Sequence, residues 1–158
     1  MVYMSTDLTW RTSSTGLSDT ARLAESLGSR LRGGEVIELV SDVGGGKTTF
    51  VKGLAKGFGS PDSVASPSFT ISREYVSGDK TMYHFDFYRL NDPGIVANEL
   101  AEVVMDEKAV VVVEWADIVE DVLPAEHVTI TIKSTGEMAR EFEISYPESL
   151  AYLIPEHT

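Results

Sequence analysis

The sequence contains no cysteine, which excludes disulfide bonds, thiolate nucleophiles and cysteine-bound zinc. Histidine is scarce as well. Its three residues, His84, His127 and His157, are far apart along the chain, which disfavours an imidazole metal cluster. No run of about 18 apolar residues occurs, and residues 1–10 lack the basic and then apolar order of a signal peptide. We therefore expect a cytoplasmic protein that does not contact a membrane.

Basic residues are scarce in the second part of the chain. The net charge is −12, to which residues 1–60 contribute +1 and residues 61–158 contribute −13. Binding a nucleic-acid backbone to such an acidic surface would cost electrostatic free energy, so direct binding of RNA or DNA is disfavoured. The acidic half is either a solvated face that keeps the protein in solution or a docking face for a basic partner protein.

The chain of 158 residues is long enough for one domain with a full hydrophobic core and short for two. We predict a single domain, residues 1–158, in which residues 1–14 are irregular and residues 147–158 form a short tail. Hydrophobic periodicity predicts helices at about 18–31, 47–58 and 91–102, and strands at 36–40, 71–76, 81–88, 109–113, 128–132 and 141–145. The fold expected from this order is α/β. It is a three-layer sandwich with a mixed, mostly parallel central sheet and a C-terminal antiparallel hairpin.

A glycine loop lies between the strand at 36–40 and the helix that follows it. Strand, glycine loop and helix, with a lysine and threonines at the helix start, are the context that a phosphate-binding P-loop requires. Lys47 would contact the β- and γ-phosphates, and the hydroxyl of Thr48 would contact Mg²⁺. The alternative is a glycine-rich turn that binds nothing, but it does not explain why Lys47, Thr48 and Thr49 open the helix. Ser41 stands where the strict pattern has its first glycine. With this loop, the expected three-layer sandwich is like that of P-loop NTPases.

Two carboxylates stand at the ends of predicted strands. The strand at 109–113 ends in Glu114, and parallel strands deliver their carboxyl ends to the edge where P-loop proteins place the acid that holds Mg²⁺. We predict that Glu114 holds the metal; a surface carboxylate is the alternative. Asp86 could orient the attacking water, share the metal or only cap its strand. His84 is interpreted as an ordinary strand histidine, and Lys52 with Lys56 as the solvated face of a helix.

Four ordered motifs of the chain resemble those of the TsaE (YjeE) family, the P-loop ATPases of bacterial tRNA threonylcarbamoyladenosine synthesis. The motifs are Ser41 to Phe50, Ser66 to Thr70, His84 to Leu90, and Glu114 with Trp115. The resemblance extends from about Leu17 to Tyr146. The departures from the family pattern are Ser41 for a glycine, Ser68 for a threonine, Ala116 for a proline, and Glu137 where a basic residue is frequent.

The resemblance implies a set of functional residues. Mg²⁺ would be held by Thr48 and Glu114, and Asp86 would assist hydrolysis together with Glu114 and Lys47. ATP would be bound by Gly44, Gly45, Gly46, Lys47, Thr48 and Thr49, with Thr20 near the adenine, and Ser66, Ser68 and Thr70 would belong to a switch loop near the γ-phosphate. The implied partners are the TsaB and TsaD proteins, through which the chain would reach tRNA only indirectly.

Other functional classes stay open at the level of the sequence. A small-molecule kinase would share the P-loop, but such enzymes usually add a basic lid, and only Arg73, Arg89 and Arg140 follow Arg32. A GTPase is disfavoured because the [NT]-K-x-D motif that reads guanine is absent. A protein-binding module gated by nucleotide, with incidental hydrolysis, is a third possibility. For the ATPase, we expect slow turnover alone and stimulation by partners.

Overall fold

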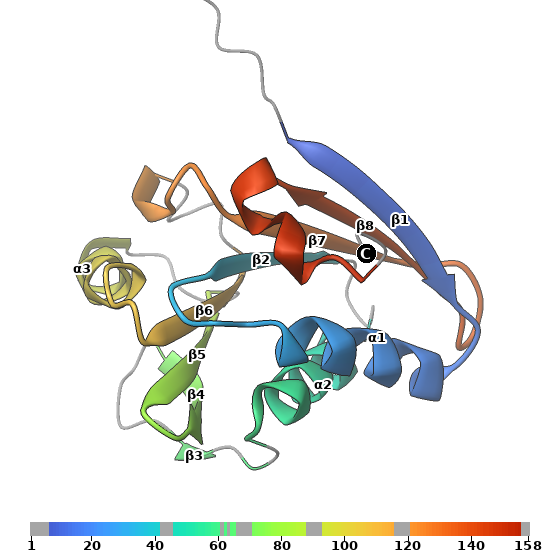
Figure 1. Ribbon diagram of the computed structural model, residues 1–158, viewed down its shortest axis with the longest axis horizontal. Helices are drawn as coiled ribbons and strands as arrows, with labels where there is room; N and C mark the ends of the chain where they lie inside the picture. Colours follow the sequence, from blue (N-terminus) through green and yellow to red (C-terminus); the bar gives the residue numbers. More distant parts are fainter. Residues whose placement is uncertain are drawn as a thin grey trace, which may run out of the picture.

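The computed structural model describes residues 7–41, 46–60, 62, 64–65, 71–87, 93–115 and 121–155. The helices are α1 (Leu17–Ser29), α2 (Lys47–Phe58), α3 (Pro93–Val104) and the 3-10 helix η2 (Glu148–Leu153). The strands are β1 (Leu8–Ser14), β2 (Val36–Ser41), β3 (Val64–Ala65), β4 (Ile71–Ser77), β5 (Lys80–Asp86), β6 (Ala109–Glu114), β7 (Val128–Ser134) and β8 (Arg140–Tyr146). One sheet runs through the molecule, with α1 and α2 on one face and α3 on the other (Figure 1).

The sheet is mixed, with strand order β1-β8-β7-β2-β6-β5-β4-β3. The four central strands, β7, β2, β6 and β5, run parallel, and the strands on both flanks pair antiparallel. Every residue of β6 is buried because helices cover both faces at the centre, which explains its uninterrupted apolar sequence. The predicted three-layer α/β fold with a mixed sheet and the β7–β8 hairpin is confirmed, and parallel pairing is limited to the four central strands.

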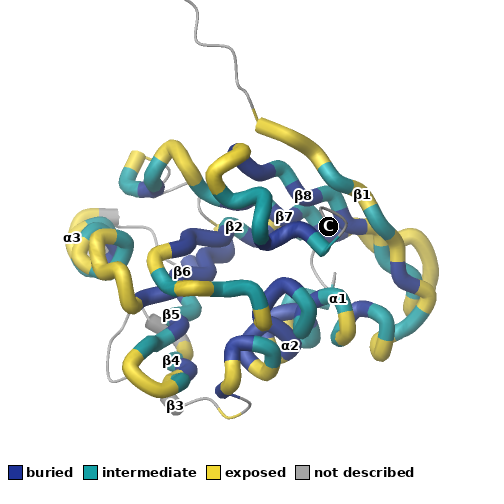
Figure 2. The backbone as a smooth tube through the Cα atoms, in the orientation of Figure 1, coloured by how far each residue is buried: buried dark blue, intermediate teal, exposed yellow. Residues whose placement is uncertain are grey.

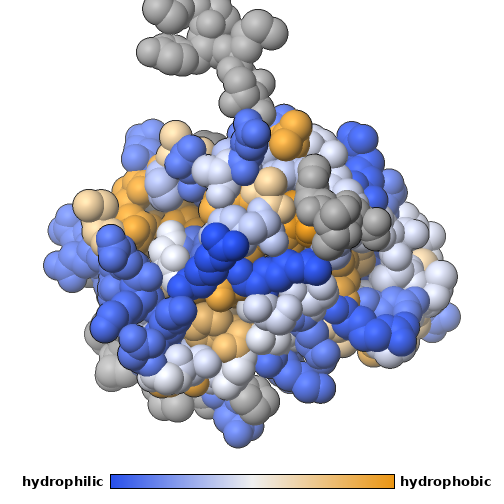
Figure 3. All heavy atoms as spheres, in the orientation of Figure 1, coloured by the Kyte–Doolittle hydropathy of each residue, from blue (hydrophilic) through white to orange (hydrophobic). Residues whose placement is uncertain are grey.

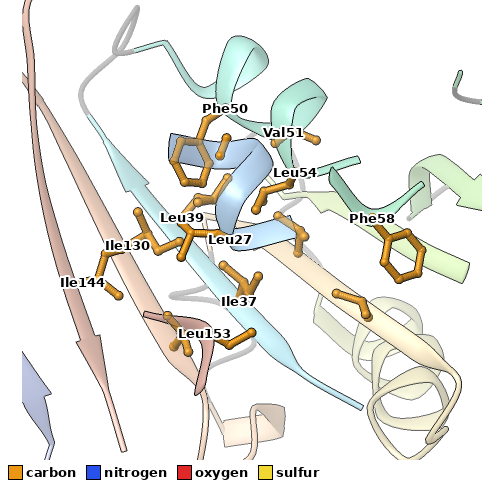
Figure 4. Packing of buried hydrophobic residues seen from close by; sticks show 14 of the residues in the cluster. Leu27, Ile37, Leu39, Phe50, Val51, Leu54, Phe58, Ile130, Ile144 and Leu153 are labelled. Atoms are coloured by element: carbon orange, nitrogen blue, oxygen red, sulfur yellow. The ribbon is translucent and has the colours of Figure 1, made fainter. Parts of the chain in front are cut away.

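Alternation along the central strands divides the core into two clusters. Ile37 and Leu39 of β2 point to the face of α1 and α2, where they meet Leu27 and Leu54 (Figure 4). Val36 belongs to the smaller cluster on the face of α3. Because successive strand residues point to opposite faces, each residue of β5 and β6 can be assigned to one of these two layers.

Helices α1 and α2 approach each other closely at two glycines. A Cβ atom on Gly28 would lie 2.1 Å from the carbonyl oxygen of Leu54, and one on Gly57 would lie 2.1 Å from that of Glu25. Both distances are shorter than any van der Waals contact, so these positions require glycine for the two helices to pack at this separation.

The prediction that residues 1–14 are irregular is wrong for the part that the structure describes. Residues 8–14 form β1, which pairs antiparallel with β8 and displaces the β7–β8 hairpin from the edge of the sheet. Trp10 packs against the larger core cluster, and Arg11 lies 3.6 Å from Glu143, its cross-strand neighbour. The segment has one large apolar residue near its centre, which is too weak a pattern to predict a strand. Its extended conformation is stabilised by pairing with β8.

The C-terminal tail is anchored to the domain through η2. Leu153 and Ile154 are buried in the larger cluster. The hydroxyl of Tyr152 donates a hydrogen bond of 2.6 Å to the carboxylate of Glu35, which also accepts backbone N–H groups of Arg32 and Gly33, each at 2.7 Å. Burial, together with the bond to Glu35, raises the pKa of the Tyr152 hydroxyl, which therefore remains a donor.

The distribution of exposed side chains follows the layers. Buried residues gather in the central strands and on the inner faces of the helices (Figure 2), and hydrophilic side chains cover much of the face shown in Figure 3. Within the described ranges, no helix is long and apolar enough to cross a membrane.

Candidate functional site

The carboxyl ends of the parallel strands meet near the start of α2. Glu114 ends β6 and pairs in register with Asp86, the last residue of β5. Helix α2 begins at Lys47, directly after Gly46, whose φ of 92° favours glycine. The strand order therefore brings the two predicted carboxylates together at the carboxyl ends of the parallel strands, where α2 starts.

Glu114 is a buried carboxylate with a basic group near each of its oxygens. The side chain is 6% exposed, Nε2 of His84 lies 3.0 Å from Oε2, and Nζ of Lys47 lies 3.9 Å from Oε1. A buried carboxylate is costly unless it is paired, and these two partners compensate for its burial. They also fix the direction in which the carboxylate points.

Lys47 connects the start of α2 to the end of β6. Its Nζ lies 4.9 Å from the centre of the Trp115 ring, in addition to its contact with Glu114. Trp115 has a φ of 60°, a conformation that a bulky residue adopts rarely and that commonly accompanies functional sites. The Lys47 side chain is 18% exposed, and its ammonium group lies between the start of α2 and the end of β6.

A pocket with a volume of about 470 Å³ lies beside this cluster. Its lining brings together three of the predicted site residues, Thr48, Asp86 and Glu114. The other lining residues are Val51, Lys52, Arg73, Tyr75 and His84. A volume of this size is within the range of small-molecule sites, about 300 to 1,000 Å³.

His84 and Lys52 were interpreted from the sequence as residues without a role in the site, and the structure places both in the lining of the pocket. Strand periodicity contains the signal for His84, because residues 84 and 86 must share one face of β5. Lys52 follows Thr48 by four residues, which brings both to the same face of α2. The spacing of Arg73 from the predicted site residues did not indicate that it would lie on the same face.

The oxygens available here fit the predicted Mg²⁺ ion. Mg²⁺ prefers carboxylate and hydroxyl oxygens and is usually held by one or two carboxylates plus phosphate oxygens. Thr48 and Glu114 provide one hydroxyl and one carboxylate at the same pocket. In the part of the chain that the structure describes, no group of three or more His, Asp or Glu side chains could hold a metal alone. Phosphate oxygens and water molecules would therefore complete the coordination.

The remaining predicted residues are placed differently. Thr20 is 2% exposed, and its hydroxyl shares a 2.8 Å hydrogen bond with that of Ser14, so it has little surface to offer to a base. Thr49 is half-buried on the first turn of α2 and is not among the residues that line the pocket. Gly44, Gly45, Ser66, Ser68 and Thr70 lie outside the described residues, and their roles remain predictions.

Arg140 is a residue that the sequence reasoning did not assign to the site. Its Nε lies 3.5 Å from the position that a Cβ on Gly46 would occupy, so the β7–β8 hairpin brings a guanidinium to the start of α2. The same side chain donates to the carbonyls of Gly136, Glu137 and Ala139, at 3.3, 3.4 and 2.8 Å. Glu137 stands after Gly136, where the family frequently has a basic residue. Arg140 nevertheless brings a basic group close to Gly46.

Comparison with known proteins gives consistent matches. A sequence model of the family described as "Threonylcarbamoyl adenosine biosynthesis protein TsaE" matches residues 14–142. The curated TsaE protein of Bacillus subtilis (strain 168) is 39% identical over 138 residues, which cover 85% of this chain and 82% of that protein. The TsaE protein of Treponema pallidum is 36% identical over 127 residues, covering 80% of this chain and 93% of the relative.

A solved structure shows the same fold. The crystal structure of YdiB from Bacillus subtilis matches this chain with a TM-score of 0.74 and 29% sequence identity. The match covers 95% of this chain and 94% of YdiB, so the two folds correspond over nearly their whole length.

Proposed function

The chain belongs to the TsaE family of threonylcarbamoyl adenosine biosynthesis proteins, and from this premise we propose that it is the component of that machinery that binds and hydrolyses ATP. In the proposed reaction, water attacks the γ-phosphorus and the bond from the γ-phosphorus to the bridging oxygen breaks, which yields ADP, phosphate and a proton. The protein would act in the cytoplasm.

One observation carries this proposal. Lys47, at the start of α2, and Glu114, at the end of the central strand β6, lie 3.9 Å apart beside a pocket. A lysine at the N-terminus of a helix can bind phosphate oxygens, and a carboxylate at the end of the neighbouring strand can hold the accompanying cation. Their juxtaposition supports phosphate chemistry at this edge of the sheet.

The residues of the site would divide the work as follows. Lys47 and the backbone N–H groups at the start of α2 would bind the phosphates, and Thr48 with Glu114 would hold Mg²⁺. When bound, Mg²⁺ would neutralise charge on the phosphate oxygens. Asp86 lines the same pocket and would orient the attacking water.

The proposed partners are the TsaB and TsaD proteins. With a net charge of −12, the chain is not suited to bind tRNA directly, so contact with tRNA would be made through the partners. ATP turnover would then reset the assembly between rounds of modification.

The Lys47→Ala variant tests the proposal. Removing the ammonium should lower steady-state release of phosphate from ATP by about 10²-fold or more, because a charge that stabilises the transferred group is lost. The matched control is Lys56→Ala on the same helix, where the lysine is paired with Glu25 at 3.2 Å and should not affect turnover. A folded Lys47→Ala protein with unchanged turnover would remove Lys47 from the phosphate site.

A further inference from the structure

The pocket extends beyond the predicted metal ligands to a second pair of basic residues. Lys52 lies one helical turn after Thr48, about 6 Å further along α2, and both line the pocket. Arg73 of β4 lines it from the sheet. Figure 1 shows α2 beside the end of the sheet that β4 and β5 form.

An irregularity in β4 determines on which face Arg73 lies. Residue 71 pairs with Phe85, whereas Arg73 pairs with His84, so β4 contains one more residue than β5 across this step. Phe85 belongs to the core on the face of α3, and His84 lines the pocket on the face of α2. In a regular strand, residues 71 and 73 would share a face. The bulge therefore brings Arg73 to the pocket, as bulges near functional sites commonly re-aim a side chain.

These two cations have no acidic partner among the described residues. Lys56 is paired with Glu25 and Arg11 with Glu143, but within the described part of the chain neither an ion pair nor a hydrogen bond is found for the side chain of Lys52 or of Arg73. Other Lys and Arg side chains of the described residues, such as Lys80 and Lys133, also form no ion pair, but Lys52 and Arg73 are the ones that line the pocket together. Together with Lys47, they outnumber the two carboxylates of the pocket, Asp86 and Glu114.

We propose that Lys52 and Arg73 form a second anion site, which takes inorganic phosphate after it leaves the nucleotide. Arginine offers a planar array of donors that fits an oxyanion, and lysine adds a compact positive charge. The site opens from the same pocket as Thr48 and Glu114, so phosphate cleaved there can reach it without crossing the acidic surface. The source of the phosphate rests on the proposed function, whereas the binding site itself does not.

Titration of the whole protein with inorganic phosphate tests this site. Binding is measured by calorimetry with and without saturating ADP and Mg²⁺, and potassium chloride at equal ionic strength controls for screening. The double variant Lys52→Gln/Arg73→Gln should bind phosphate at least about tenfold more weakly, because charge-assisted hydrogen bonds are lost. The matched control is Lys80→Gln/Lys133→Gln, which removes two positive charges outside the pocket and should bind like the wild type.

The variant Lys47→Ala separates the second phosphate site from the proposed hydrolysis of ATP. Phosphate binding that survives Lys47→Ala but is lost in Lys52→Gln/Arg73→Gln supports the second site, even if the protein proves unable to hydrolyse ATP. Phosphate binding that depends on Lys47 alone, or identical titrations for the double variant and the wild type, would overturn it. Absence of phosphate binding to the wild type would overturn it as well.

Discussion

At the scale of single residues, the surroundings of Glu114 are the most informative. The carboxylate is almost fully buried, yet a lysine and a histidine approach its two oxygens. Lys47 comes from the helix start and His84 from the neighbouring parallel strand, so three separate elements determine where the carboxylate points. A metal ligand that is already oriented in this way loses little freedom when an ion binds.

The variant Glu114→Gln tests the metal role of this carboxylate. The amide keeps the shape of the side chain without its charge, so the protein should fold, and the Mg²⁺ concentration for half-maximal ATP turnover should rise at least about tenfold. The measurement is a Mg²⁺ titration of phosphate release.

Glu38 provides a matched control for this titration. It is also a carboxylate paired with a histidine, since its Oε2 lies 3.3 Å from Nε2 of His127, but it does not line the pocket. Glu38→Gln should therefore leave the Mg²⁺ requirement unchanged. Superimposable titrations for Glu114→Gln and the wild type would place the metal elsewhere.

The sequence predicted where Glu114 would lie and left open whether Asp86 would lie beside it or only cap its strand. Both residues stand at the end of a β-rich run, and the parallel register of β5 and β6 brings them together. Arg73 could not be found in this way, because its face depends on a bulge between residues 71 and 73. A single inserted residue moves all later side chains of the strand to the opposite face of the sheet, and the local sequence contains no signal for it.

At the scale of the elements, the contact between α1 and α2 sets the position of the helix that starts at Lys47. The backbones approach so closely at Gly28 and Gly57 that a side chain at either position would overlap a carbonyl oxygen of the other helix. The helix pair covers the larger core cluster, and the orientation of α2 decides where Lys47 and Thr48 lie. Packing at these glycines thus determines the position of Lys47 and Thr48, although the glycines do not line the pocket.

Gly28→Ala should destabilise the protein by about 1 to 3 kcal/mol, because the added methyl group forces the helices apart. Helix propensity alone would predict the opposite, a gain of about 1 kcal/mol. The measurement is the free energy of unfolding in denaturant. Gly16→Ala is the control, since no atom lies within 4 Å of the added Cβ, and its effect should remain under about 1 kcal/mol. A stabilised Gly28→Ala protein would contradict the packing argument.

The start of β7 is tied to β2 by a titratable pair. His127 lies 3.3 Å from Glu38 through Nε2, and its Nδ1 donates to the carbonyl of Pro124 at 2.7 Å. With Nδ1 donating, only the protonated ring can also donate to the carboxylate. The hydrogen bond with Glu38 is the main cause that raises the pKa of His127 above its ordinary value, against the opposing effect of burial.

This shift predicts how stability depends on pH. A raised pKa in the folded state means that protonation of His127 stabilises the fold. The contribution is fully present below the unfolded pKa of about 6.5, and it is lost as the pH rises through the higher folded value. The difference in unfolding free energy between the wild type and His127→Gln should therefore shrink as the pH rises above about 6.5 and through the raised pKa of the folded state. A difference that does not change with pH would exclude the ion pair as its source.

Elements with a strong periodic pattern were predicted well, and elements held by tertiary pairing were not. The helix that begins near Pro93 and the central strand that ends at Glu114 both match the structure. Strand β1 was missed because its apolar side chains are few, and its hydrogen bonds go to β8, more than 120 residues later in the chain. Such pairing is long-range information that a local window does not contain.

At the scale of the whole molecule, the charge distribution bears on how the protein would be regulated. The sequence is acidic overall and carries most of its negative charge in residues 61–158. In the described part of the chain, no basic lid covers the pocket; its basic lining comes from α2, β4 and β5. In enzymes that hydrolyse nucleotides, one further positive charge supplied by another protein can raise the rate by about 10³ to 10⁵.

The most direct test of the proposed function is steady-state release of phosphate from ATP under three conditions: the protein alone, with tRNA, and with a TsaB–TsaD pair. We predict slow turnover by the protein alone, no change on addition of tRNA, and a large increase with the partner pair, on the order of 10³-fold. Full activity of the protein alone, or stimulation by tRNA without the partners, would contradict the account and indicate an independent enzyme.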